Sequence, residues 1–140
     1  KRLGVADVFV CSGEGNCVQR VLEETGGLGA DVIFTSCPSP DAQVDAIHMA
    51  KNRARINFFG GLPKDNSKVL LDTNIIHYKE LLVSGAHGAM PVHHAKALEL
   101  IQMGRIDVRK YVTHHFPLDD ILGAFAAAEQ HGGLRVVVNP

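Results

Sequence analysis

The stretch TGGLGADVIF, residues 25–34, places three glycines directly before a run that is typical of a buried β-strand. A phosphate-binding loop has its glycines after a strand and before a helix, because the helix N-terminus offers free N–H groups and the positive end of its dipole. Gly26, Gly27 and Gly29 have the opposite order, because they follow a helical pattern that ends at Thr25. Glycine just past a helix end is the usual left-handed cap. We therefore predict a helix-to-strand turn here rather than a phosphate loop.

On both sides of this turn, apolar runs and helical patterns alternate along the chain. The apolar runs are nearly continuous, which suits strands buried on both faces of a parallel sheet. The predicted strands are Ala6–Val10, Ala30–Ser36, Ala54–Gly60, Glu80–Ala86 and Leu134–Asn139. The predicted helices are marked by Val18, Val21 and Leu22; by Val44, Ile47 and Ala50 with Asp41 ahead of them; by Ala95, Leu98 and Ile101; and by Ile121, Leu122, Phe125 and Ala128 behind Asp119 and Asp120. This order predicts β-α-β units and a doubly wound α/β fold with a mainly parallel sheet, in a single domain over residues 1–140.

Composition excludes several functional classes. The 140 residues are 46% hydrophobic and 21% charged, as in a folded domain, and the net charge of −1 gives no electrostatic reason to bind nucleic acid or an anionic membrane. No apolar run approaches the roughly 18–20 residues that span a bilayer. The chain begins at Lys1 without an initiator Met or a signal peptide, so we expect a fragment or a processed piece of a longer protein. Cys11, Cys17 and Cys37 form no C-x-x-C pair and favour a reducing, cytoplasmic setting.

A second glycine pair has the order that phosphate binding requires. In VFVCSGEGNCV, residues 8–18, a predicted strand is followed by Gly13-x-Gly15 and then by a helix. The third glycine of the G-x-G-x-x-G pattern is missing, because Val18 occupies its place, so a strand-to-helix loop with flexible glycines stays open as the alternative. Parallel sheets bind ligands at the carboxyl ends of their strands. The positions to examine are therefore Ser12–Gly15, Ser36–Ser39, Gly60–Leu62 and Ser84–Gly88.

Six segments occur together in one order: TGGLGADVIF, INFFGGLP, LDTNIIHYKELLVSGAHG, HHAKALELIQMGRID, YVTHHFPLDDILGAFAAAE and LRVVVNP. In this combination the chain, from about Leu3 to Pro140, resembles the C-terminal part of the medium-chain, zinc-dependent dehydrogenases, nearest to the sorbitol, polyol and threonine dehydrogenases. The resemblance implies a partial Rossmann fold that lacks its first two strands and ends in a segment returning towards an absent catalytic domain. It also implies a parent that transfers a hydride between NAD or NADP and an alcohol or polyol. The catalytic zinc is then expected only in the absent N-terminal domain, and this chain alone is expected to be inactive.

The resemblance also implies which residues contact the dinucleotide. Ser12, Gly13 and Gly15 would edge the adenine pocket, and Ser36 and Cys37 would approach the nicotinamide ribose. From the residues alone, a cysteine such as Cys37 is more often a small buried apolar side chain than a ligand.

The remaining implied cofactor contacts are small residues after the next two strands, together with one arginine. They are Gly60, Gly61 and Leu62; Ser84, Gly85 and Ala86; and Arg135. The second group would lie beside the nicotinamide carboxamide and at a subunit contact, whereas the guanidinium would reach the pyrophosphate. Without the resemblance, the glycine pair reads as a tight turn and the arginine as a solvated side chain.

The eight histidines do not predict a metal site. His93-His94 and His114-His115 are adjacent pairs, and adjacent residues point to different faces of a helix or a strand. We therefore expect no metal ligands and no catalytic residue in this chain. His114, at the end of a predicted strand, is the one candidate for acid–base chemistry, and the sequence shows no partner for it.

Two other functional readings stay open. One is a non-catalytic α/β module that binds a small molecule or serves assembly. The other is a flavodoxin-like nucleotide binder, in which Ser12–Gly15 would hold phosphate.

The two strands that the resemblance implies are missing would lie between Ala6–Val10 and Ala30–Ser36. Three strand spacings of ~4.8 Å would then leave a gap of about 14 Å in the sheet. We therefore expect Ala6–Val10 to shift and pair with Ala30–Ser36, or a partner chain to cover the edge, and we expect a homo-oligomer through Leu81–Gly88.

Overall fold

The computed structural model describes residues 4, 6–11, 15–130 and 133–140. The described residues form the α-helices α1 (Cys17–Glu24), α2 (Pro40–Met49), α3 (Thr73–Tyr78), α4 (Pro91–Gln102) and α5 (Ile121–Glu129). They also form the strands β1 (Ala30–Thr35), β2 (Ala50–Phe58), β3 (Leu82–Gly85), β4 (His114–Pro117) and β5 (Val136–Asn139), and the short 3-10 helices η2 (Lys64–Asn66), η3 (Val108–Tyr111) and η4 (Leu118–Asp120). No described helix is both long and apolar enough to cross a membrane.

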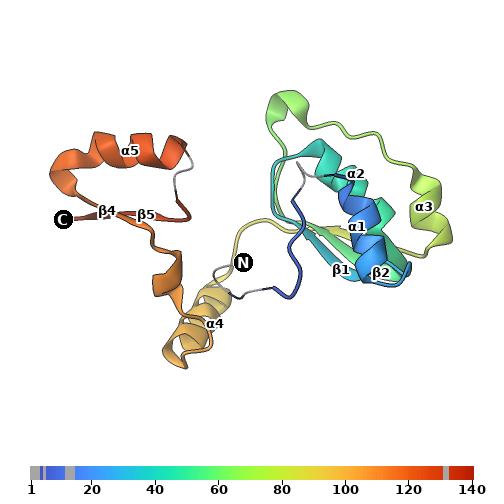
Figure 1. Cartoon of the computed structure of the whole chain (residues 1–140), viewed down its shortest axis with the longest axis horizontal. Helices are drawn as coiled ribbons and strands as arrows, with labels where there is room; N and C mark the ends of the chain where they lie inside the picture. The colour runs from blue at the N-terminus through green and yellow to red at the C-terminus, as the bar shows by residue number, and fades with distance from the viewer. Residues whose placement is uncertain (1–3, 5, 12–14, 131–132) are drawn as a thin grey trace. The chain divides into compact units, whose positions relative to one another are not determined.

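The chain divides into two compact units, unit 1 (residues 3–88) and unit 2 (residues 89–140) (Figure 1). Unit 1 contains a three-stranded parallel sheet with the order β1-β2-β3. Helix α2 connects β1 to β2, and α3 precedes β3. Parallel strands joined through helices confirm the predicted α/β class with a parallel sheet. A single domain over residues 1–140 stays a prediction.

The core of unit 1 lies on one face of this sheet. Ala46 and Ile47 of α2 are fully buried against Ala50, Ala54 and Ile56 of β2. The opposite face carries apolar side chains that are 55–65% exposed, which are Val32, Phe34 and Leu82. The expectation that the strands are buried on both faces is therefore wrong for unit 1. Side chains alternate across a sheet, and α2 packs on only one of its faces.

Local capping explains where α1 and α2 begin. The Asn16 side chain accepts a hydrogen bond from the Gln19 N–H at 3.1 Å, and the Ser39 hydroxyl accepts one from the Ala42 N–H at 3.3 Å. Pro40 occupies the first turn of α2, where its missing N–H costs nothing. Each helix therefore starts at the residue type that satisfies its free N–H groups.

The glycines after α1 form the predicted helix-to-strand turn. Gly26 and Gly27 have φ angles of 62° and 83°. The Gly27 N–H donates to the Leu22 carbonyl at 2.7 Å, and the Gly26 N–H donates to the Glu23 carbonyl at 3.2 Å. This pair of bonds is the Schellman motif, which closes a helix with left-handed residues. The prediction of a helix cap is confirmed.

Residues 6–10 do not form the predicted strand. Val8, Phe9 and Val10 are 45%, 38% and 39% exposed, and this segment pairs with no strand of the described chain. The expected shift to pair with β1 is wrong, because a strand needs a hydrogen-bonded neighbour and none is formed here. Coverage of that edge by a partner chain stays a prediction.

Unit 2 contains α4, η3 and a second β-α-β unit. Strands β4 and β5 are parallel, with His114 opposite Val136, and α5 is the helix between them. The strand predicted at 134–139 is confirmed from Val136 onward. His114 begins β4 rather than ending a strand.

The helix α3, in unit 1, was not predicted, since its six residues are too few to show a clear helical period.

Candidate functional site

The candidate site is the carboxyl edge of the β1-β2-β3 sheet, where three strands end level with one another. Thr35 of β1 lies beside Phe58 of β2, and Phe58 lies beside Gly85 of β3. The loops that follow these strands therefore start at one edge of unit 1. They contain the predicted positions Ser36, Cys37, Gly60, Gly61, Leu62 and Ala86, and Ser84 and Gly85 end the third strand.

The loops after β1 and β2 are in direct contact. The Gly60 N–H donates a hydrogen bond to the Thr35 carbonyl at 2.7 Å. A Cβ atom on Gly60 would lie 2.8 Å from the carbonyl oxygen of Cys37 and 3.0 Å from its backbone nitrogen. Only glycine fits at this position without a clash. The structure thus brings together Gly60 and Cys37, which the sequence analysis placed in different loops.

Gly61 and Gly85 have open space around them instead. A Cβ atom on either residue would meet no atom within 4 Å. Ser36 and Cys37 are also exposed, and the Cys37 side chain is not the buried apolar group of the alternative reading. The edge therefore presents accessible backbone on which another molecule can lie.

A polar row crosses the sheet near this edge. The Asn57 side chain donates to the Ser84 hydroxyl at 3.1 Å, and that hydroxyl donates to the Ile56 carbonyl at 3.3 Å. The Asn57 Oδ1 atom is buried and accepts no hydrogen bond from the described residues, and the same holds for Thr35 Oγ1. Asn57 was missed in the sequence analysis. Its signal was a polar residue inside the otherwise apolar run INFF.

A cavity of about 660 Å³ lies between the N-terminal ends of α1 and α2. It is lined by Gly15, Asn16, Cys17, Cys37, Ser39, Asp41, Ala42 and Asp45. Two predicted cofactor positions, Gly15 and Cys37, thus border one cavity. Carboxylates accept hydrogen bonds from hydroxyl groups and repel phosphate, so the Asp41 side of this cavity suits a sugar better than an anion.

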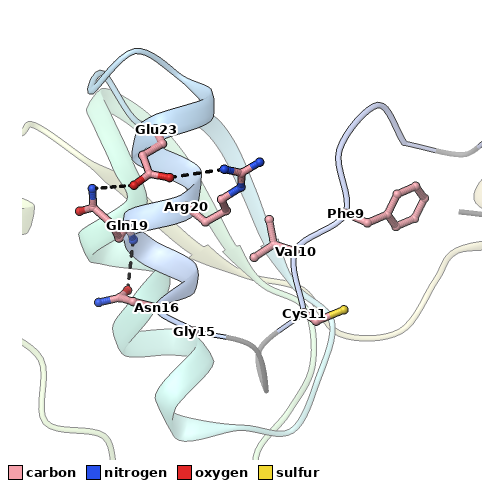
Figure 2. A pocket seen from close by; sticks show the side chains of 8 residues that line it. All are labelled: Phe9, Val10, Cys11, Gly15, Asn16, Gln19, Arg20 and Glu23. Atoms are coloured by element: carbon pink, nitrogen blue, oxygen red, sulfur yellow. Dashed lines mark hydrogen bonds and ion pairs between the residues drawn. The ribbon is translucent and has the colours of Figure 1, made fainter.

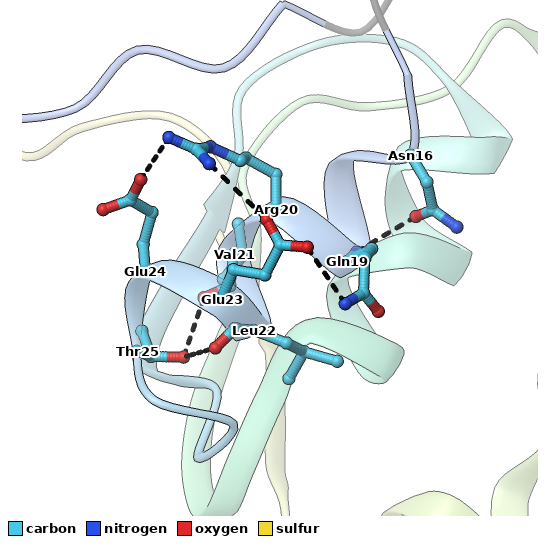
Figure 3. A network of polar contacts seen from close by, with 8 residues as sticks. All are labelled: Asn16, Gln19, Arg20, Val21, Leu22, Glu23, Glu24 and Thr25. Atoms are coloured by element: carbon cyan, nitrogen blue, oxygen red, sulfur yellow. Dashed lines mark hydrogen bonds and ion pairs between the residues drawn. The ribbon is translucent and has the colours of Figure 1, made fainter.

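A second cavity, of about 360 Å³, lies between residues 9–11 and α1 (Figure 2). The Val10 side chain points towards Arg20 of α1, whereas the Phe9 ring points away from the helix (Figure 2). Arg20 pairs with Glu23 at 3.4 Å and with Glu24 at 2.5 Å, as Figure 3 shows. Its charge is therefore already compensated, and it is a poor candidate for binding a phosphate. Ser12 and Gly13, which were predicted to edge an adenine pocket, lie outside the described residues.

In unit 2, the predicted phosphate ligand Arg135 lies one residue before β5 and is exposed. Its backbone carbonyl accepts a hydrogen bond from the backbone N–H of Thr113 at 2.9 Å and lies 3.2 Å from the Thr113 hydroxyl. Within the described chain, its guanidinium forms no ion pair.

The titratable groups of the described residues form no metal-binding cluster. In the described ranges, no three His, Cys, Asp or Glu side chains lie close enough together to hold a metal ion. His114 Nδ1 lies 3.0 Å from the Thr113 hydroxyl, and His115 Nδ1 lies 3.4 Å from the Asn139 side chain. The pKa of Asp107 in unit 2 is lowered, mainly by the hydrogen bond from the Arg109 side chain. That pair lies outside the candidate site.

Together, the fold and the edge define a parallel α/β protein in which glycine and small residues follow the carboxyl ends of the strands. Residues 1–103 match the family described as zinc-binding dehydrogenase. The chain therefore belongs to the zinc-binding dehydrogenase family.

Known relatives agree with this membership. The chain is 28% identical over 141 residues to an L-threonine 3-dehydrogenase of Bacillus licheniformis, which covers 99% of this chain and 40% of that protein. It is 22% identical to a sorbitol dehydrogenase of Halalkalibacterium halodurans, again over 40% of that protein. The chain spans about two fifths of the length of these curated relatives.

Solved structures show the same fold. The 2R,3R-butanediol dehydrogenase of Bacillus subtilis superposes with a TM-score of 0.82 at 26% identity, over 95% of this chain and 38% of that chain. A zinc-binding dehydrogenase of Sinorhizobium meliloti 1021, described as putative and bound to NADP, gives a TM-score of 0.86 at 23% identity, over 96% and 40% of the two chains. These matches confirm the predicted resemblance and the fold.

Proposed function

We propose that the chain is the later part of the NAD(P)-binding domain of an oxidoreductase that acts on an alcohol or polyol. Relatives of this chain are named for threonine, sorbitol and butanediol, all of which carry hydroxyl groups. The observation that carries the proposal is the seating of Gly60 on the Cys37 backbone beside the open positions Gly61 and Gly85. This arrangement suits an extended ligand that lies across the carboxyl ends of parallel strands.

The residues present fit a nicotinamide dinucleotide. Gly61 leaves the space that backbone contact with a ligand requires, and Ser36 and Cys37 are exposed beside it. We assign Gly15 to the adenine side and Ser36 and Cys37 to the ribose side. Gly60, Gly61, Leu62, Ser84, Gly85 and Ala86 are assigned to the cofactor along the edge, and Arg135 to its phosphates.

The nicotinamide ring, when bound, supplies the hydride acceptor or donor. The part of this chain is to bind and orient the dinucleotide and to exclude water along its edge. The residues present do not fit a zinc ion, since the described ranges hold no cluster of three possible ligands. We therefore assign no catalytic step to this chain and expect it to show no turnover by itself.

A binding experiment tests this proposal. The chain is titrated with NADH and with NADPH, and binding is followed by calorimetry. Gly61→Val fills the space proposed for the cofactor, although the free chain has room for the added side chain. We expect it to weaken dinucleotide binding at least tenfold while the midpoint of urea unfolding stays unchanged. Ser67→Val, at an exposed position outside these loops, is the control.

Two outcomes would overturn the proposal. One is a folded wild-type chain that binds neither dinucleotide, which would favour a non-catalytic assembly module instead. The other is a Gly61→Val chain that binds as tightly as the wild type.

We also propose that two copies associate through β3. This strand is at the edge of the described three-stranded sheet, so its outer N–H and C=O groups are available to a second strand. Val83→Pro removes one N–H and blocks strand pairing. We expect light scattering to report a dimer for the wild type and a monomer for this variant.

The three cysteines are free thiols, which supports a reducing, cytoplasmic setting for the protein. The protein is purified from the cytoplasm of its cells and denatured, and its reactive thiols are counted. We expect three reactive thiols per chain. A disulfide found in that material would contradict this placement.

A further inference from the structure

The backbone of Arg135 is held by Thr113, which lies directly before β4. The Thr113 Oγ1 atom accepts hydrogen bonds from the Leu134 N–H at 3.0 Å and from the Arg135 N–H at 3.4 Å. The Arg135 carbonyl in turn accepts from the Thr113 N–H at 2.9 Å and lies 3.2 Å from the hydroxyl. Both backbone polar groups of Arg135 are thus tied to Thr113.

Gly133 leaves the space that this hydroxyl occupies. A Cβ atom at position 133 would overlap Thr113 Oγ1 and would come within 2.6 Å of the His114 ring. The turn into β5 therefore combines a residue without a side chain with a hydroxyl that fills the vacated volume. Both residues are needed for this arrangement. Without the Thr113 hydroxyl, or with a side chain at position 133 that displaces it, the N–H groups of Leu134 and Arg135 would lose the oxygen to which they donate.

The Arg135 side chain contrasts with its fixed backbone. Arg20 and Arg109 each pair with a carboxylate close to them in the sequence, and Arg53 pairs with Glu80. The Arg135 guanidinium forms no such pair with the described residues and is exposed. A free guanidinium on a restrained backbone loses less conformational freedom when it binds an anion.

We propose that Thr113 is a positioning residue for Arg135, which it holds ready to contact the pyrophosphate of a dinucleotide. The proposal rests on the proposed function for the ligand, and on the hydrogen bonds above for the positioning. Thr113 itself does not touch the ligand. Its effect on affinity is therefore limited to ligands that carry the phosphates.

The test compares Thr113→Val, which has the same shape without the hydroxyl, with Thr113→Ser, which keeps it. The probes are ADP-ribose, which carries a pyrophosphate, and adenosine, which does not, each titrated into the full chain. We expect Thr113→Val to weaken ADP-ribose binding by about three- to tenfold, as for the loss of a hydrogen-bonded restraint. Adenosine binding should stay unchanged, and Thr113→Ser should restore the affinity for ADP-ribose.

A matched control is available in unit 1. The Thr25 hydroxyl also ties a turn together, because it donates to the Val21 carbonyl at 2.7 Å and accepts from the Gly29 N–H at 3.0 Å. Thr25→Val should lower stability and leave ADP-ribose affinity unchanged. Equal loss in both threonine variants would show a general effect of stability and would overturn the proposal.

Arg135→Ala separates the inference from the proposed function. If Arg135→Ala weakens ADP-ribose binding, Thr113→Val must have no further effect in that background, and an additive effect overturns the positioning role. If Arg135→Ala changes nothing, or if the wild-type chain does not bind ADP-ribose, the assignment of this arginine to the phosphates is wrong.

Positioning can be measured without any ligand. Amide hydrogen exchange of Leu134 and Arg135 should accelerate at least tenfold in Thr113→Val and return towards the wild-type rate in Thr113→Ser. Gly133→Ala should accelerate the same two amides, because it displaces the hydroxyl from the opposite side. Unchanged exchange in the valine variant would overturn the inference, whatever the binding results are.

Discussion

Gly60 lies directly on the backbone of Cys37, so close that a Cβ atom would be 2.8 Å from the Cys37 carbonyl oxygen. This contact joins the loops after β1 and β2 at the carboxyl edge of the sheet. Because the neighbouring atoms belong to the backbone, they cannot move aside as a flexible side chain would.

We therefore expect Gly60→Ala to destabilise the chain by about 1–3 kcal/mol, as overpacking does elsewhere. Gly61→Ala is the matched control, since a Cβ atom there meets nothing within 4 Å, and it should change stability by less than ~0.5 kcal/mol. Urea unfolding followed by circular dichroism measures both values. Equal stability of the two variants would show that the loops are not in contact.

Gly26 and Gly29 lie in the turn after α1 and were predicted not to bind phosphate, and alanine variants of the two should differ in their free energy of unfolding. Gly26→Ala forces a side chain into a φ angle of 62°, at a cost of about 1 kcal/mol. Gly29 combines a φ angle of 89° with a Cβ position 2.5 Å from the Met49 carbonyl oxygen. Gly29→Ala should therefore be the more destabilising variant.

Neither of these turn variants should change the affinity of the folded chain for NADH. Calorimetric titration under conditions where both variants are more than nine-tenths folded checks this expectation. A tenfold loss of affinity in Gly26→Ala would show that the turn contacts the ligand after all.

The order of elements could be predicted from the sequence, because each carries its own local signal. Ser39 and Pro40 mark the start of α2, and Gly26 and Gly27 mark the end of α1, through hydrogen bonds made within a few residues. Burial could not be predicted in the same way. Val32 reads as a core residue by composition, yet it is 55% exposed, because exposure depends on what packs on that face.

Long-range contacts at the candidate site were also beyond reach of the sequence. Gly60 was chosen as a ligand contact, but its first role is to admit the Cys37 backbone from a different loop. Thr113 lies in one of the six segments quoted for the resemblance, but nothing in that segment singled it out, because its role depends on Arg135, which lies 22 residues away. Such contacts depend on the folded chain, and neither propensity nor periodicity encodes them.

Glu80 provides a test of backbone strain at the opposite end of the sheet from the candidate site. Its φ angle is 53°, in the left-handed region, and its carboxylate pairs with Arg53, whose φ angle is 63°. Glu80→Ala and Glu80→Gly both remove the ion pair, but only glycine relieves the backbone. We expect Glu80→Gly to be about 1 kcal/mol more stable than Glu80→Ala in urea unfolding, and the reverse order would contradict a strained conformation.

Asp107 gives a prediction for the dependence of stability on pH. The hydrogen bond from the Arg109 side chain lowers the pKa of Asp107 below its ordinary value of 3.8. Because the pKa is lower in the folded state, the pair stabilises the fold above the unfolded pKa, and this contribution disappears as the pH falls through the folded pKa. Comparison of urea unfolding for the wild type and Asp107→Asn should show a difference at pH 7 that becomes smaller as the pH falls below 3.8. A difference that does not change with pH would mean that the aspartate acts through something other than its charge.

The hydrogen bonds of the Thr113 hydroxyl also predict which nitrogen of His114 carries the proton. The oxygen already accepts from the N–H groups of Leu134 and Arg135, which uses both of its lone pairs. A third N–H from His114 Nδ1 would have no lone pair left, so at 3.0 Å the hydroxyl must donate to an unprotonated Nδ1. The neutral ring is then protonated at Nε2. A long-range ¹⁵N–¹H NMR spectrum at pH 8 should show Nδ1 at the shift of an unprotonated nitrogen and Nε2 at that of a protonated one. Thr113→Val should move both shifts towards the average of the two tautomers, and a wild-type ring protonated at Nδ1 would mean that the hydroxyl donates to the Arg135 carbonyl instead.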